Sequence, residues 1–65
     1  MSFRDNIAFV EQRDGKAAAL DYAKRCRNSY RASVLHCTRG NQFRAGWIRN
    51  YLTAKQYIRS VKNAS

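Results

Sequence analysis

Residues 41–62 read NQFRAGWIRNYLTAKQYIRSVK and decide the fold of this chain. Their apolar side chains recur at steps of four and three along one stripe, whose members are Phe43, Trp47, Tyr51, Ala54, Ile58 and Val61. This spacing is typical of one face of an α-helix. Thr53 and Gln56 match a capping box that could break the helix near Leu52. The stripe passes through this point in phase, so a continuous helix is favoured.

Residues 14–37 carry a second stripe with the same period. Its members are Ala19, Ala23, Cys26, Tyr30, Ser33 or Val34, and Cys37. Asp14 is placed to cap the start of this helix, and Gly40 with Asn41 supplies its stop and the cap of the next one. Two long helices joined by a turn of about three or four residues run antiparallel.

A shorter helix is expected over residues 3–12. Ser2 and Asp5 fit a capping box, after which Phe3, Ile7 and Val10 lie on one side of the helix.

We therefore predict one all-α domain over residues 1–65. It consists of an antiparallel helical hairpin, residues 14–37 and 41–62, with the short helix 3–12 lying across one side. Chains of this size bury only about 60% of their unfolded surface. A homodimer would add to this thin core and stays open at this point.

Composition limits the classes of function. The 65 residues include 13 Lys and Arg against four Asp and Glu, a formal net charge of +9. The hydrophobic share of 45% argues against disorder, and no apolar run is long enough to cross a membrane. Acidic residues interrupt the N-terminal apolar stretch, unlike a signal peptide. Two cysteines without a secretion signal indicate reduced thiols and a cytoplasmic protein.

The charge is unevenly spread along the chain. Residues 1–21 contain all four acidic residues, whereas residues 22–65 contain ten cations and no acidic residue. A solvated helix face usually mixes both signs to gain ion pairs between successive turns. The missing acids therefore favour an anionic partner.

Helical spacing predicts that the cations gather on one surface. At about 100° per residue, the cations of each long helix fall on one flank of its stripe, in the same rotational sense. In an antiparallel hairpin the two flanks face the same side. We predict a nucleic-acid-binding surface formed by Lys24, Arg27, Arg31, Arg44, Lys55, Arg59 and Lys62, with Lys16 on the same flank. Leu20, Ile48 and Leu52 share this flank and could hold the first helix or a second copy.

Aromatic residues lie among these cations. Stacking on unpaired bases would give them a function. Those on the stripes, Tyr30, Phe43, Trp47 and Tyr51, are better explained as core residues. Tyr22 and Tyr57 lie off the stripes, and both interpretations stay open for them.

The sequence offers little catalytic chemistry. His36, Cys37 and Cys26 do not have the paired spacing of a structural zinc site. His36 and Cys37 point about 100° apart on a helix, which is poor aim for a nucleophile and its base. We expect no metal, no cofactor, no small-molecule substrate and no enzymatic activity.

The segment Arg44-Ala-Gly-Trp47-Ile48-Arg49-Asn50-Tyr51 resembles the R-x-x-W-L/I-x-G-W signature of the ribosome modulation factor family. Residues 15–30 have the length of that family's glycine-spaced first helix, and Gly15 and Tyr30 match it, although Asn28 and Ser29 replace its Cys-Pro turn. The resemblance implies a two-helix cytoplasmic protein that binds ribosomal RNA on the small subunit and silences translation. Arg44, Trp47 and Tyr51 carry over from this resemblance as positions that match the family.

The leading hypothesis is a non-catalytic RNA-binding, ribosome-associated protein that modulates translation. One alternative is a small DNA-binding accessory or regulatory protein, of the kind that phages and mobile elements encode. Another is an inhibitor that binds an acidic surface of a host protein. Membrane binding is disfavoured because folding needs both apolar stripes.

Overall fold

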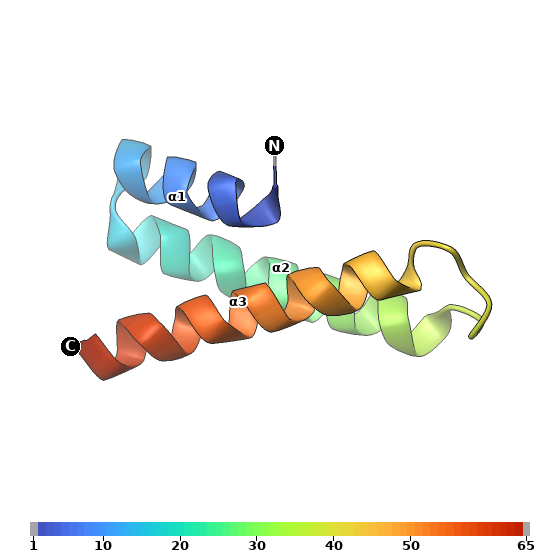
Figure 1. The fold of residues 1–65 in the computed structure, drawn as a ribbon. Helices are drawn as coiled ribbons and strands as arrows, with labels where there is room; N and C mark the ends of the chain where they lie inside the picture. The colour runs from blue at the N-terminus through green and yellow to red at the C-terminus, as the bar shows by residue number, and fades with distance from the viewer. Residues whose placement is uncertain (1, 65) are drawn as a thin grey trace.

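Three helices form the chain in the computed structural model, which describes residues 2–64. They are α1 (Phe3–Asp14), α2 (Lys16–His36) and α3 (Arg44–Ala64). Helices α2 and α3 lie side by side and run in opposite directions, and α1 folds back over them near the C-terminus (Figure 1). With 86% of the described residues helical and none in a strand, the all-α prediction is confirmed.

The N-terminus of α1 is capped as its sequence predicts. The Asp5 backbone N–H donates to Ser2 Oγ at 3.2 Å, and the Ser2 N–H donates to Asp5 Oδ2 at 3.4 Å. The helix runs to Asp14, two residues beyond the predicted end. Asp14 does not cap α2, because it belongs to α1 and accepts from Arg13 Nε at 3.0 Å.

Gly15 alone connects α1 to α2. Its N–H donates to the Glu11 carbonyl oxygen at 2.9 Å, and its own carbonyl accepts from the Ala19 N–H at 3.1 Å. One residue thus ends one helix and begins the next. The φ of 96° that this reversal requires is strained for any residue with a Cβ.

The connection between α2 and α3 is longer than predicted. Helix α2 ends at His36, because Cys37 takes an extended conformation, and Gly40 lies in a turn beyond it. Asn41 Oδ1 accepts from the Phe43 N–H at 2.8 Å, so Asn41 organises a turn before α3 begins at Arg44. Helix α3 continues through Leu52 without a break, and the Thr53 hydroxyl donates back to the Arg49 carbonyl at 3.0 Å.

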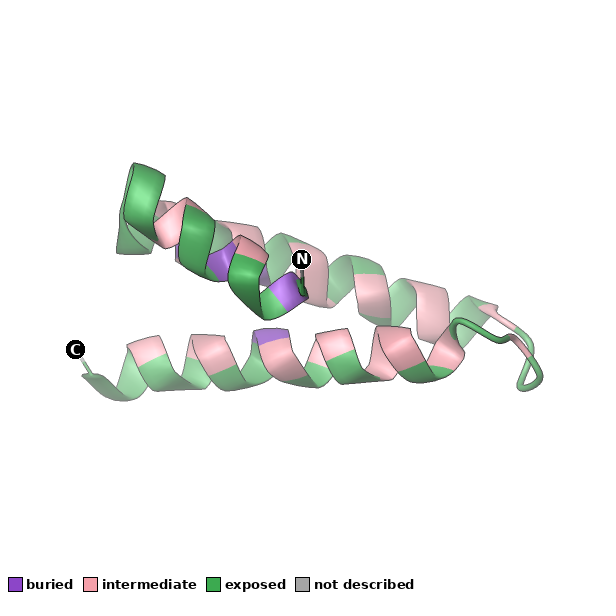
Figure 2. Cartoon of the chain, turned by 45° about the horizontal axis from the view of Figure 1, so that its top comes forward, coloured by how far each residue is buried: buried purple, intermediate pink, exposed green. Residues whose placement is uncertain are grey.

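The buried core lies in the half of the hairpin that α1 covers (Figure 2). Its buried members are Phe3, Ile7, Ala19, Ala23 and Ala54. Its alanines lie on α2 and α3, and the Phe3 ring of α1 lies edge-on to Tyr30 at 5.3 Å between ring centroids. The loop end of the hairpin contributes no buried residue within the described part of the chain.

Candidate nucleic-acid interface

Helix α1 occupies one flank of α3 and leaves the other flank open. Thr53, Tyr57 and Ser60 line the groove between α3 and α1. Lys55, Arg59 and Lys62 each follow one of these residues by two positions, which is about 200° around a helix. These three cations therefore lie on the flank turned away from α1.

The cations of α2 also lie on the flank turned away from α1. The ring of Tyr22 packs beside Phe3 of α1 at 6.1 Å between centroids, and Lys24 follows Tyr22 by two positions. Arg27 and Arg31 share the flank of Lys24. The side of the molecule opposite α1 thus receives cations from both long helices.

A shallow depression on this side joins the two helices. Arg27 of α2 lines it together with Lys55, Ile58, Arg59 and Lys62 of α3. Leu52 and Gln56 line a second depression on α3 with the same Lys55 and Arg59, and Gln56 also lines the groove beside α1. Cations from two helices therefore surround a common hollow, and we call the surface formed by Lys24, Arg27, Arg31, Lys55, Arg59 and Lys62 the basic face.

Most side chains of the basic face are exposed, and Arg27 is half-buried. Arg27 Nε donates to Asn28 Oδ1 at 3.3 Å, and Lys55 Nζ lies 5.6 Å from the centre of the Tyr51 ring. Two side-chain ion pairs of the described residues, Arg13–Asp14 and Arg25–Asp21, each at 2.9 Å, lie outside the basic face. The acidic side chains all belong to α1 and the first turns of α2.

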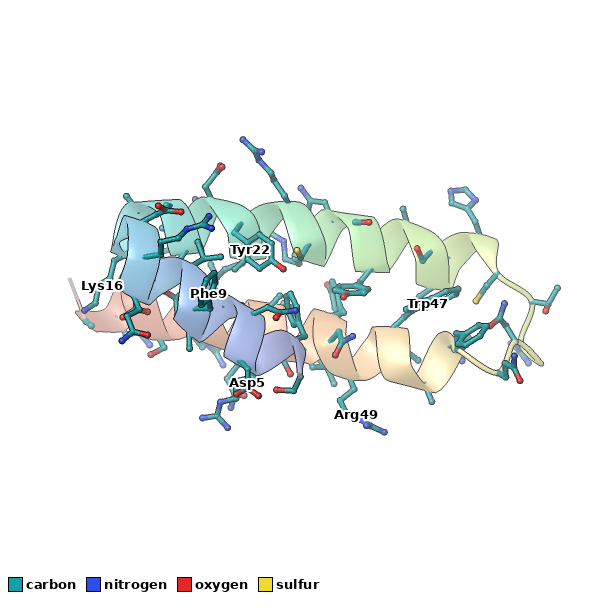
Figure 3. All side chains as sticks on the ribbon, turned by 90° about the horizontal axis from the view of Figure 1, so that it is seen from above. Asp5, Phe9, Lys16, Tyr22, Trp47 and Arg49 are labelled. Carbon is teal, nitrogen blue, oxygen red and sulfur yellow. The ribbon has the colours of Figure 1, made fainter. Side chains whose placement is uncertain are left out.

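Arg44 shares this flank but stands at the loop end, about 16 Å along α3 from Lys55 at 1.5 Å per residue. Lys16 is exposed at the opposite end, where α1 meets α2 (Figure 3). Of the predicted set, Arg27, Lys55, Arg59 and Lys62 line one depression. Helical spacing places Lys24 and Arg31 on the same flank, and Arg44 stands apart. Arg49, which is not among the predicted binding residues, points outward from the outer edge of α3 (Figure 3).

The aromatic predictions have mixed outcomes. Phe43 is 59% exposed, so its assignment to the core is wrong. It precedes α3 and lies beyond the part of the hairpin that α1 covers. Tyr22 and Tyr57 pack against the core, and Tyr57 donates to Glu11 Oε2 of α1 at 2.7 Å. These two side chains hold α1 in place, which argues against a stacking role for either.

The groups that bear other chemistry are isolated. Cys26 packs against the core, and Cys37 Sγ donates to the Val34 carbonyl at 3.3 Å; both thiols are free. Within residues 2–64, no three His, Cys, Asp or Glu side chains gather in a way that could hold a metal ion. None of the three helices, over the same residues, is long and apolar enough to cross a bilayer.

Comparison with protein-family models, curated proteins and solved structures finds no match to this chain.

Proposed function

We propose that this chain is a non-catalytic RNA-binding protein that lies along the phosphate backbone with its basic face. The observation that carries the proposal is the convergence of Arg27 from α2 with Lys55 and Arg59 from α3 around one depression. Arginine guanidinium groups offer forked donors that match phosphate oxygens. Phosphates that bind these cations release their counterions, which supplies affinity.

The shape of the basic face favours backbone contacts over reading of a DNA groove. Two packed helices, 8–10 Å apart and each about 10–12 Å in diameter, present a surface roughly 20 Å wide. The major groove of B-DNA is about 12 Å wide and admits a single helix. Folded RNA offers irregular phosphate surfaces that suit a broad, shallow face.

The proposed target is ribosomal RNA in the cytoplasm, with modulation of translation as the consequence. This part of the proposal draws its support from the resemblance of residues 15–51 to the ribosome modulation factor family. The homodimer also stays a prediction. A second copy seated on Leu52 would bring two basic faces together, and their repulsion would weaken such a dimer at low salt.

The test is recovery of the tagged protein from cells with and without nuclease, followed by sequencing of the bound RNA and DNA. We expect co-sedimentation with ribosomes that is lost when Arg27, Arg31, Lys55 and Arg59 are all replaced by glutamate. A predominance of duplex DNA in the recovered material would favour the DNA-binding alternative. A protein partner that stays bound after nuclease treatment would instead favour the inhibitor.

A further inference from the structure

The structure exposes an aromatic ring at the loop end of the hairpin. Phe43 is 59% exposed, although its backbone is held in place. Its N–H donates to Asn41 Oδ1 at 2.8 Å, and its carbonyl accepts from the Trp47 N–H at 3.0 Å. The ring is thus presented to solvent from a fixed position, so that a ligand stacking on it need not order the backbone.

Trp47 extends this surface. Its ring centroid lies 6.1 Å from that of Phe43, with 34° between the ring planes. Trp47 lies between α2 and α3, beyond the end of α1 (Figure 3). The two rings together form what we call the aromatic tip, in which Phe43 is exposed and Trp47 is half-buried.

Two arginines lie close to the aromatic tip in sequence. Arg44 follows Phe43 directly, and the exposed Arg39 lies in the same connection. Residues 22–65 contain no acidic residue, so neither arginine has an acidic neighbour in sequence. Arg44 also lies on the flank of the basic face, so a polyanion bound there could reach the tip along α3.

Other exposed apolar side chains lack this combination. Leu35 and Leu52 are 68% and 55% exposed but offer no π-face. Phe9 is 53% exposed on α1, with Arg13 already over its ring at 5.3 Å and Asp14 paired to that arginine. Among the described residues, Phe43 alone has an exposed ring and nearby arginines in sequence that have no acidic neighbour in sequence.

We infer that the aromatic tip is a stacking site for unpaired RNA bases, which makes the preferred ligand a single-stranded segment or loop rather than a duplex. Aromatic rings bind bases of any sequence through their π-faces, and nearby cations hold the adjoining phosphates. Bases within a duplex are already stacked and cannot reach such a ring. This inference rests on the proposed RNA-binding function and names its substrate class.

The experiment titrates the purified full chain with a labelled single-stranded RNA of about 12 nucleotides and with a duplex of the same length. The chain contains one tryptophan, so quenching of Trp47 fluorescence reports directly on the tip. We expect Phe43→Ala to weaken single-strand binding roughly 5- to 150-fold and to leave duplex binding unchanged. Phe43→Leu should behave like Phe43→Ala, and Phe43→Tyr should retain affinity.

Leu35→Ala is the matched control, because it removes another exposed apolar side chain at the same end of the hairpin. Leu35→Ala should change the affinity for neither the single-stranded RNA nor the duplex. Circular dichroism should show that all variants are folded. The inference is overturned if Phe43→Ala leaves single-strand binding unchanged, or weakens single-strand and duplex binding equally. Either result leaves the proposed role of the basic face unaffected. Failure of the native protein to bind either RNA would instead overturn the proposed function itself.

Discussion

At the scale of single residues, Gly15 carries the largest backbone constraint. Its φ of 96° suits glycine, and a Cβ built there meets no atom within 4 Å, so conformational strain alone opposes substitution. We expect Gly15→Ala to lower the free energy of unfolding by about 1 kcal/mol. Urea denaturation followed by circular dichroism measures this change.

Gly46 is the matched control for that substitution. It lies within α3, and an added Cβ again meets nothing within 4 Å. Because alanine forms helices better than glycine, Gly46→Ala should raise stability by about 0.5–1 kcal/mol. Changes of the same sign at both positions would contradict this account of the Gly15 reversal.

Tyr57 makes stability depend on alkaline pH. Burial, together with the hydrogen bond to the Glu11 carboxylate, raises the pKa of Tyr57 from 10.0 to about 12. The folded protein therefore holds this proton more tightly than the unfolded chain. The resulting stabilisation is fully present below pH 10 and is lost as the pH rises towards 12.

Replacing Tyr57 by phenylalanine tests this dependence. At pH 7 the variant should lose about 1 kcal/mol of stability with the hydrogen bond. Between pH 10 and 12 the native protein should lose stability faster than Tyr57→Phe, as measured by thermal unfolding. The pKa of Tyr22 is also raised, chiefly by burial. Its contribution to the pH dependence of stability has the same sign in the native protein and in Tyr57→Phe. Parallel pH profiles would show that the Tyr57 hydroxyl has no such effect.

At the scale of elements, α1 is held chiefly by Phe3 and Ile7. Phe3→Ala leaves a cavity beside Tyr22 and Tyr30, and we expect a loss of about 3 kcal/mol. That is a large share of what a chain of this length can have, at roughly 0.05–0.15 kcal/mol per residue. Phe9→Ala, on the exposed side of the same helix, should cost below about 1 kcal/mol. Equal losses in thermal unfolding would show that α1 is not docked through Phe3.

The helices themselves could be predicted from sequence because apolar periodicity and the Ser2–Asp5 capping box are local signals. The ends of the helices depend on local backbone and capping interactions that the spacing of apolar residues does not reveal. Asp14 joined α1 because the Gly15 reversal needs no side-chain cap, and α3 began after the turn that Asn41 organises. Phe43 continued the stripe in register, yet it lies outside the helix and outside the reach of α1, so it is exposed.

At the scale of the whole molecule, α1 decides which surfaces stay open. The sequence predicted a basic flank but left Leu20, Ile48 and Leu52 as a dock for the first helix. That alternative is wrong, because α1 packs on the opposite flank, beside Tyr22 and Tyr57. Periodicity places residues around one helix, whereas the choice of flank depends on contacts between helices that are distant in sequence.

The proposed function requires that six cations of α2 and α3 act as one phosphate-binding face. The most direct measurement is the salt dependence of RNA affinity for a variant in which Arg27, Arg31, Lys55 and Arg59 are glutamine. Its charge-matched control has glutamine in place of Arg4, Arg13, Arg25 and Arg49. The slope of log affinity against log salt should fall by about 0.7 for each lost phosphate contact in the first variant and stay unchanged in the control. An equal fall of this slope in the variant and in its control would contradict a single phosphate-binding face, because only the total charge would then matter.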